Sequence, residues 1–436
     1  MKAHTLDLAL ALTLMLPVVP AAAEELDFRP LFNGRDLTGW VNVNCHPTTF
    51  QVRDGVIVCS GIPMGVLRTE EQYENFILEL EWMHVHPQGN AGLFVWSDDI
   101  TARGQPFTRS IEVQIMDGNH GDVFAIQGAR MTPDRPHPRG WMRALPTEER
   151  AHPAGEWNHY RVHCEDGRIT LAVNGAVVSS GGEASPRKGY ICLESEGSEV
   201  HFRNIRIHEL PSTNPPPEDV AIADRGFRSL YNGQDLDGWQ ADPGHEGHWV
   251  PTDWRLRYDG RSQAADPNLW TEESFTDFEL IVDWRWTGEP QRVTRPVILP
   301  SGEQAVDEEG NPQSVEVLDA GDSGIYLRGS SKAQVNIWCW PVGSGEIWGY
   351  RTDAAMPAEV RRGATPLTQA DAPIGRWNRF EITLRGEHVT VVLNGQTVID
   401  NAHLPGIPPG GPIALQHHGD PIELANIYIR ELDGPQ

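Results

Sequence analysis

The strongest constraint on the fold is an internal repeat, because five blocks of the sequence return in the same order. The pairs are Leu31–Trp40 with Leu230–Trp239, Phe76–Trp82 with Phe278–Trp284, Gly155–Asn158 with Gly375–Asn378, Ile169–Val178 with Val389–Val398, and Gly189–Leu210 with Gly411–Leu432. Ordered self-similarity of this kind indicates a tandem duplication. The 436 residues also suit two domains of about 200 residues each. We therefore expect two copies of one domain.

The boundaries of the two copies follow from the segment between them. Pro211–Asp219 (PSTNPPPED) is polar and rich in proline, which predicts an extended spacer. We expect domain 1 to span residues 26–210, the linker residues 211–225 and domain 2 residues 226–432.

The first 23 residues have the pattern of a signal peptide. Met1-Lys2 is a basic start, Leu8–Val19 is an apolar run, and Ala21–Ala23 is a small-residue cleavage pattern. The run is too short for a membrane span, and no cysteine follows it to carry a lipid anchor. The sequence thus predicts a secreted or periplasmic protein without a membrane anchor.

Within each copy the pattern is that of β-strands joined by turns. Ile77–Trp82 and Glu279–Trp284 are short β-rich runs with partial alternation. Asn174-Gly175 and Asn394-Gly395 each stand between two β-rich runs, which is a strong hairpin signal. The sequence therefore predicts an all-β fold in which each copy is a two-sheet sandwich or jelly roll.

Charge and cysteine content limit the partners and the chemistry. A formal net charge of −26 argues against nucleic acid and anionic membrane as partners, and leaves neutral or cationic ligands. The pairs Cys45–Cys59 and Cys164–Cys192 are candidates for disulfides, with buried free thiols as the alternative. The sequence has no CxxC pair, so a cysteine zinc site has no support.

Taken together, several blocks resemble the 3-keto-disaccharide hydrolase family over almost all of both domains. They are Leu31–Trp40, Asn90–Phe94, Glu112–Asp117, Glu156–Asn158, Val173–Gly175 and Phe202–Ile205 in domain 1, and Leu230–Trp239, Asp322–Arg328, Gly375–Asn378 and Ile413–Ile429 in domain 2. The resemblance implies two tandem concanavalin-like jelly-roll sandwiches. It also implies action on glycosides oxidised at C3, either as hydrolases or as 1,2-lyases paired with hydration of a 2-hydroxy-3-keto-glucal.

The chemistry of such a substrate defines what a site would need. A ketone at C3 acidifies the hydrogen on C2, so a carboxylate or histidine can remove that proton. Hydrogen-bond donors or a metal ion near the C3 oxygen would stabilise the enolate. The group on C1 then leaves, and addition of water gives net hydrolysis.

In domain 1 the best candidates lie on two predicted strands. Along Ser110–Asp117, strand alternation places Glu112 and Gln114 on one face, whereas Asp117 would need a bulge to join them. Glu194 and Glu196 share a face of a later strand. We take Glu112, Asp117 and Glu194 as candidate catalytic residues and Gln114, Trp96 and His120 as candidate substrate-binding residues. A solvated sheet face is the alternative explanation.

Domain 2 lacks the acids of this pattern. Gln334 and Asn336 align with Glu112 and Gln114, and Gln416 aligns with Glu194. Domain 2 is thus either a binding or structural copy, or a site that uses other groups. We take Asp322, Arg328, Gln334, Asn336, Gln416 and His417 as candidate substrate-binding residues, with Glu346, Arg351 and Asp353 as further candidates. Trp96 of domain 1 stands where the family has an arginine, as at Arg328.

Three functions from different classes fit these residues. The first is an exported enzyme that cleaves 3-keto-glycosides, and the second is a lectin-like carbohydrate-binding protein. The third is an ordinary glycosidase with two carboxylates, Glu112 with Asp117 or Glu194. The partner in each case is a small saccharide or glycoside. No cofactor is certain; a divalent ion held by His84, His86, His120 or His137 with Glu112 or Asp117 is one alternative to loop histidines.

Overall fold

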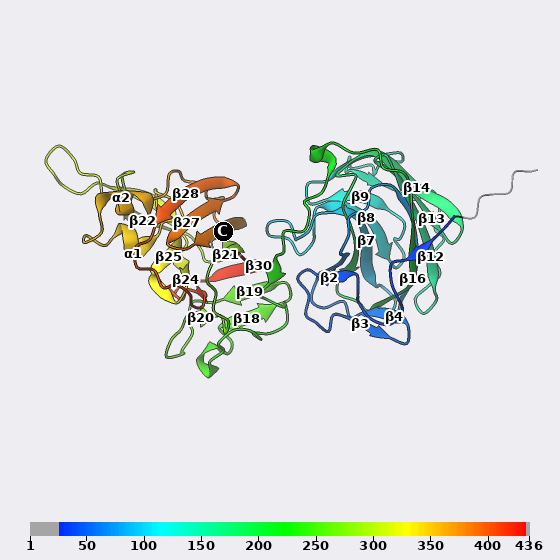
Figure 1. Cartoon of the computed structure of the whole chain (residues 1–436), viewed down its shortest axis with the longest axis horizontal. Coiled ribbons are helices and arrows are strands. Elements are labelled where there is room, and N and C mark those ends of the chain that lie inside the picture. The colour runs from blue at the N-terminus through cyan, green and yellow to red at the C-terminus, as the bar shows by residue number, and fades with distance from the viewer. Residues whose placement is uncertain (1–25, 433–436) are drawn as a thin grey trace, which may run out of the picture.

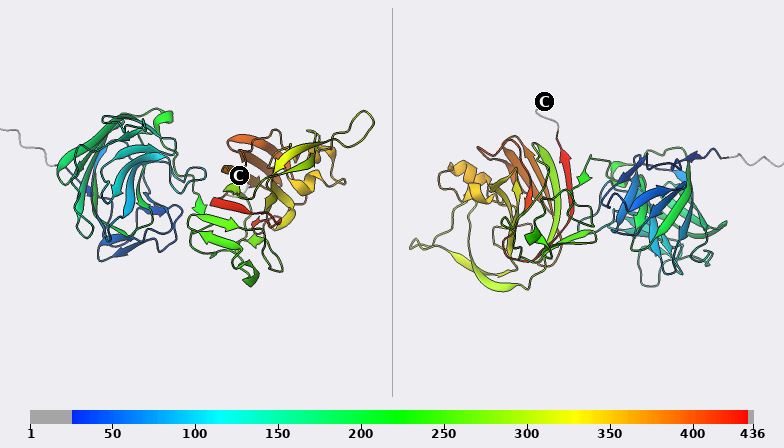
Figure 2. Two further views of the ribbon diagram at one scale, coloured as in Figure 1. Left: turned by 180° about the vertical axis from the view of Figure 1, so that it is seen from behind. Right: turned by 90° about the horizontal axis from the view of Figure 1, so that it is seen from below.

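The computed structural model describes residues 26–432, which form two β-sheet lobes lying side by side (Figure 1, Figure 2). The predicted signal peptide, residues 1–23, lies outside the described residues. Both lobes are built of antiparallel strands, which confirms the predicted all-β class with two tandem jelly-roll sandwiches.

Domain 1 is a sandwich of a nine-stranded and a seven-stranded sheet. The first sheet has the order β10 (Arg130–Pro133), β14 (Ala176–Ser185), β13 (Arg168–Val173), β12 (Asn158–Glu165), β6 (Phe76–His84), β16 (Val200–Glu209), β4 (Val56–Cys59) and β3 (Phe50–Arg53), with β1 (Arg29–Pro30) beside β16. The second has the order β11 (Arg143–Ala144), β9 (Val123–Ile126), β8 (Ser110–Met116), β7 (Asn90–Ser97), β15 (Tyr190–Ser195), β5 (Gly65–Thr69) and β2 (Trp40–Asn42). The core between the sheets is apolar.

Domain 2 has an eight-stranded sheet facing a shorter four-stranded one. The first has the order β18 (Trp249–Thr252), β19 (Arg255–Tyr258), β30 (Ile422–Glu431), β21 (Phe278–Trp286), β26 (Asn378–Arg385), β27 (His388–Leu393) and β28 (Gln396–His403), with β17 (Arg228–Ser229) beside β30. The second has the order β20 (Leu269–Trp270), β29 (Ala414–Leu415), β24 (Asp322–Leu327) and β25 (Ser330–Trp338). A hairpin of β22 (Gln291–Pro296) and β23 (Ser314–Asp319) and two short helices, α1 (Trp348–Arg351) and α2 (Ala358–Gly363), complete it.

The repeated blocks form the same local structures in both copies. In the first block Asn33 donates a hydrogen bond to Asp36 at 2.7 Å, and the Trp40 indole donates to the Leu31 carbonyl at 3.0 Å. The equivalent residues of domain 2 make the same two bonds. Hydrogen bonds from side chains to nearby groups of this kind stabilise tight turns, so the repeated block is a turn motif.

Both predicted Asn-Gly hairpins are confirmed. Asn174 and Gly175 have φ angles of 46° and 87° between β13 and β14, and Asn394-Gly395 has the same conformation between β27 and β28. Two consecutive positive φ angles suit Asn-Gly and match the twist of the flanking strands. The Asn174 amide also donates to Asn158 at 3.0 Å, which ties the hairpin to the repeated Trp-Asn block.

A loop of domain 1, Asp98–Arg109 between β7 and β8, makes much of the contact between the lobes. The Asn426 side chain of β30 donates to the carbonyls of Ala102 and Gln105 at 3.2 and 3.0 Å. Asp283, which is buried and paired with Arg379, accepts the Gly104 N–H at 2.7 Å. In domain 2 the connection at this place is only the turn between β24 and β25, so this clamp belongs to domain 1 alone.

All five cysteines are free thiols, so the free-thiol alternative holds in the structure. Four of them are buried, and Cys339 is partly exposed. Among residues 26–432 there is no helix with the length and apolar character needed to cross a membrane.

Candidate active site

The predicted acidic residues of domain 1 meet on the outer face of the seven-stranded sheet, the face turned away from the core. In β8, Gln114 lies opposite Gly92 of β7, and Glu112 lies opposite Phe94. On the other side of β7, Leu193 of β15 pairs with Leu93, which sets Glu194 beside Gly92. The alternation predicted from sequence therefore places Glu112, Gln114 and Glu194 on one face across three neighbouring strands.

Gly92 makes the close approach of the two carboxylates feasible. A Cβ atom at this position would lie 2.5 Å from Glu194 Oε2 and 3.1 Å from Glu112 Oε1. Both oxygens thus lie over the backbone of residue 92, where any side chain would displace them. Glu112 and Glu194 form a carboxylate pair above a glycine.

Burial dominates the electrostatics of this pair. Glu112 is 5% exposed and Glu194 is 1% exposed. Burial, and then the charge of Glu196, raises the pKa of Glu112 from 4.5 to about 8. Burial and the neighbouring Glu112 raise the pKa of Glu194 well above its usual value. Two like charges in a low-dielectric site cannot both ionise readily, so the pair retains a proton at neutral pH.

Neighbouring side chains complete a polar row around the pair. The Asn90 amide donates a hydrogen bond to Glu196. Burial raises the pKa of Glu196 as well. On the far side of β8, Asp122 pairs with Arg143, and the Arg143 guanidinium lies 4.5 Å from the centre of the Phe124 ring. Gln114 Oε1 accepts the Ile115 N–H at 3.2 Å, which leaves its Nε2 group free to donate to a ligand.

Three other candidates of domain 1 have structural contacts instead. Asp117 follows β8 in the turn, where its carboxylate accepts the Gln88 N–H at 2.8 Å. His120 is buried, and its Nε2 accepts the N–H groups of Arg150 and Ala151 at 3.1 and 2.9 Å. Trp96 is fully buried, and its indole donates to the Glu74 carbonyl at 2.8 Å. The structure does not bring these three side chains to the carboxylate pair.

Domain 2 carries amides at the equivalent positions. The Gln334 side chain donates to Gln416 Oε1 at 2.6 Å, directly over Gly324, which is the counterpart of Gly92. Asn336 of β25 pairs with Gly324, as Gln114 pairs with Gly92. Gln334, Asn336 and Gln416 thus form a neutral copy of the acidic row.

The ionisable groups of domain 2 lie at the margins of this row. Asp322, at the position of Asn90, has its pKa raised to about 6 by burial. Glu346, at the position of Asp122, lies 2.6 Å from Arg351, and burial raises its pKa to about 7. Asp353 pairs at 2.7 Å with Lys332, which precedes Gln334 by two residues on β25.

Two further candidates of domain 2 face other parts of the fold. Arg328 is buried at the end of β24, where it donates to the carbonyls of Thr276, Gly386 and Pro408 and pairs with Asp277. Like Trp96, it has a positive φ angle, so both residues fill the same structural position. His417 lies next to the row in sequence, but its Nδ1 atom is bonded to the Tyr258 hydroxyl.

The histidines proposed as metal ligands do not converge. His84 Nε2 lies 2.8 Å from the Ile115 carbonyl, and His137 stacks on Trp141 with ring centres 4.4 Å apart. Within residues 26–432, no three histidine, cysteine, aspartate or glutamate side chains are grouped to hold a metal ion.

Sequence reasoning missed Asp122, Arg143 and Gly92 as parts of the site. Gly92 carried a signal, because Gly324 stands at the same place in the second copy. Asp122 and Arg143 carried none, since they come from a turn and a short edge strand whose pairing with β9 is not visible in the sequence.

A pair of carboxylic acids is the catalytic group that most glycoside hydrolases use. The chain belongs to the family described as 3-keto-alpha-glucoside-1,2-lyase-like domain, whose model matches residues 27–208 and 226–430. A curated relative from Bacteroides thetaiotaomicron, named 3-keto-disaccharide hydrolase, is 23% identical over 231 residues, which are 41% of this chain and 77% of the relative. Together these findings identify a hydrolase-type enzyme.

Each of the similar solved structures matches a part of this chain about as long as one domain. A protein of Parabacteroides distasonis, described as a candidate glycosyl hydrolase, is 26% identical and covers 42% of this chain and 94% of its own, with a TM-score of 0.35. A carbohydrate-binding module of Bacillus subtilis is 12% identical and covers 39% of this chain and 96% of its own, with a TM-score of 0.27.

Proposed function

We propose that this protein cleaves 3-keto-glycosides by removal of the C2 proton and elimination, followed by hydration, and that domain 1 carries the catalytic site. The observation that carries the proposal is the Glu112–Glu194 pair, two buried carboxyl groups with raised pKa values whose facing oxygens lie 3.1 and 2.5 Å from one point above Gly92. A site that offers one base and one acid side by side matches the two proton transfers of this reaction.

In the proposed reaction Glu112 is the base, because it is the more exposed member of the pair. It takes the proton from C2, and the C–H electrons move to the C3 carbonyl to form an enolate. When the ketone re-forms, the bond between C1 and the leaving oxygen breaks, and Glu194 supplies the proton to that oxygen. Water then adds to C1 of the 2-hydroxy-3-keto-glucal. Glu194 takes a proton from this water, and Glu112 returns its proton to C2.

The enolate oxygen needs a hydrogen-bond donor on the same face. Gln114 is suited to this, because its Oε1 atom is held by the Ile115 N–H while its Nε2 group faces the row. Arg143 supplies positive charge beyond Phe124, although Asp122 neutralises part of it. Such preorganised donors stabilise charge that develops in the transition state.

The geometry is less suited to an ordinary two-carboxylate glycosidase. The facing oxygens of Glu112 and Glu194 lie 3.1 and 2.5 Å from one point above Gly92. They are therefore nearer than the separation of about 6.5 Å or more that an inverting enzyme uses to hold a water. A retaining enzyme sets its carboxyl groups about 5–5.5 Å apart, so the assay on the unoxidised parent described below is what distinguishes it from the proposed reaction.

Domain 2 is proposed as a binding or structural copy, because amides replace both members of the pair. The signal pattern of residues 1–23 supports export to the periplasm or the exterior.

The test is an assay of the purified mature protein on a 3-keto-glucoside and on its unoxidised parent, each with and without EDTA. We expect cleavage of the keto form alone. Loss of activity in EDTA would add a metal ion to the mechanism. Cleavage of the parent would favour the ordinary glycosidase, and binding without cleavage of either would favour the lectin-like alternative.

A further inference from the structure

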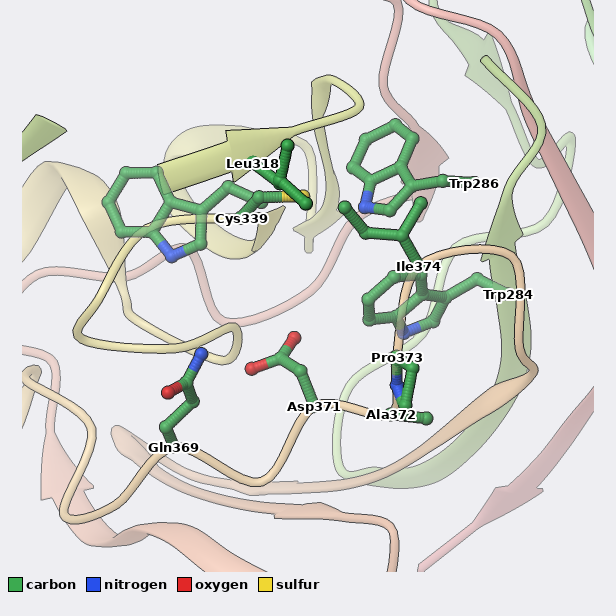
Figure 3. A pocket seen from close by; sticks show the side chains of 10 residues that line it. Trp284, Trp286, Leu318, Cys339, Gln369, Asp371, Ala372, Pro373 and Ile374 are labelled. Carbon is green, nitrogen blue, oxygen red and sulfur yellow. The ribbon is translucent and has the colours of Figure 1, made fainter. Parts of the chain in front are cut away.

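A pocket at one end of the domain 2 sandwich lies outside the row of amides and the site proposed above (Figure 3). It has a volume of about 340 Å³. Strand β21 contributes two tryptophans, β25 a third, and the loop before β26 forms the opposite wall. The lining residues are Trp284, Trp286, Leu318, Trp338, Cys339, Gln369, Asp371, Ala372, Pro373 and Ile374.

Three polar atoms in this pocket have no partner within the described chain. Trp284 and Trp286 are 1% and 4% exposed, and neither indole N–H has an acceptor among residues 26–432. Asp371 Oδ2 accepts the Ser344 N–H at 3.0 Å, whereas its buried Oδ1 has no donor in the same part of the chain. In Figure 3 the Asp371 carboxylate extends into the space between the tryptophans. Leaving such buried groups unpaired costs about 1–3 kcal/mol each, and a ligand in the pocket that bonds to them would recover this cost.

Domain 1 fills the equivalent space with its own chain. His84 occupies the position equivalent to Trp286 of domain 2. Its Nε2 atom lies 2.8 Å from the Ile115 carbonyl oxygen. A Cβ atom at Gly89 would lie 2.3 Å from the same ring, so the backbone packs directly against it. In domain 2 the much longer connection through β22 and β23 replaces this segment. The pocket is therefore open in the second copy and closed in the first.

The groups around the pocket define the class of ligand. An indole N–H is only a donor, so it needs an acceptor on the ligand, which an ammonium group lacks. The Asp371 carboxylate disfavours an anion. A neutral ligand with hydroxyl groups can accept from Trp286 and donate to Asp371, while its C–H faces pack on the indole rings. A volume of about 340 Å³ is within the range of small-molecule sites and leaves room for a sugar ring.

We propose that this pocket binds one neutral pyranose unit, with Trp286 and Asp371 as its hydrogen-bonding residues. The site is independent of the carboxylate pair of domain 1, so the proposal does not require the reaction proposed above.

Cys339 supplies a built-in probe for the pocket. It lines the cavity and is partly exposed, whereas Cys45, Cys59, Cys164 and Cys192 are buried. Alkylation of the native full-length protein with N-ethylmaleimide, mapped by mass spectrometry, should thus report access to the pocket. The probe ligand is methyl β-glucopyranoside, and tetrahydropyran, a ring of the same size without hydroxyls, is the control.

We expect methyl β-glucopyranoside to slow alkylation of Cys339 by at least about 5-fold at saturation, and tetrahydropyran to leave it unchanged. Asp371→Asn, which keeps the size of the side chain, and Trp286→Phe should each weaken the protection about 10-fold, as loss of one hydrogen bond of about 1.4 kcal/mol predicts. Glu112→Gln should keep full protection, which separates this site from that of domain 1. Absence of protection in the unmodified protein, equal protection by tetrahydropyran, or full protection in the folded Asp371→Asn variant would each overturn the proposal.

Discussion

The two copies of this domain share their turns and central strands but differ at the middle of the outer sheet face. Over Gly92 domain 1 holds two carboxylates, whereas over Gly324 domain 2 holds the amide of Gln334, which is bonded to the amide of Gln416. The amides satisfy each other through a hydrogen bond of 2.6 Å. Glu194 Oε2 is buried without a partner within the described residues. The same backbone therefore supports a satisfied neutral pair and a strained acidic pair.

Because domain 2 folds with amides at these positions, the acidic pair is not needed for folding. Domain 2 has the same glycine and the same strand pairing with amides in place of the acids. Buried, like-charged carboxylates lower stability, and such groups are concentrated in functional sites. The comparison therefore assigns chemistry to domain 1 and leaves domain 2 free for binding.

The largest effect is expected from Glu112→Gln, which gives domain 1 the residue that domain 2 has. Removal of a general base should lower kcat/KM on a 3-keto-glucoside by about 10²–10⁴-fold. Because the amide is nearly the same size, the far-UV circular dichroism and the melting temperature should not fall. Steady-state kinetics and a thermal melt measure both.

The reciprocal variant Gln334→Glu is the matched control, and we expect it to leave turnover unchanged because Gln416 cannot act as its acid partner. Full activity in Glu112→Gln, together with loss of activity in Asp322→Asn or His417→Ala, would move the catalytic site to domain 2.

A smaller effect is expected from adding one methyl group beneath each pair. In Gly92→Ala the new Cβ would lie 2.5 Å from Glu194 Oε2, so the carboxylates must shift from their positions. Misplacement of a catalytic group by about 1 Å can cost up to about 10²-fold in rate, and we expect a decrease of about 10–100-fold in kcat. Gly324→Ala would displace the Gln334 side chain, whose Nε2, Cγ and Cδ atoms would lie 2.6, 2.7 and 3.0 Å from the new Cβ, and should leave kcat unchanged. Equal decreases in both variants would contradict the assignment of catalysis to domain 1.

The sequence predicted the fold well because the signals are local and occur twice. The Asn-Gly hairpins, the strands around Leu78 and Leu280, and the duplication itself are all visible as short patterns. Alternation along β8 and β15 also placed Glu112 and Glu194 correctly on one sheet face.

The sequence could not predict the environment of each candidate. Trp96 and Arg328 look like binding residues in a motif, yet both are buried, with hydrogen bonds to backbone carbonyls. His120 looks like a ligand but fixes a loop. Such contacts join residues far apart in the chain, so a local pattern carries no record of them.

The smallest effect is expected in the pH dependence of stability, measured on the double variant Glu112→Gln/Glu194→Gln. The folded protein holds protons on this pair that the unfolded chain releases near pH 4.5, since burial raises the pKa of Glu112 to about 8. The contribution to stability is therefore complete below pH 4.5 and is lost as the pH rises toward 8.

Urea unfolding of the unmodified protein should show the free energy of unfolding falling over this range, by about 1.4 kcal/mol for each unit of pKa difference that the pair retains. The double variant carries the amide pair of domain 2 and should lack this dependence, so it should be the more stable protein at pH 8. An identical pH profile in both proteins would mean that the two carboxyl groups titrate normally, and the basis for an acid and a base in domain 1 would be lost.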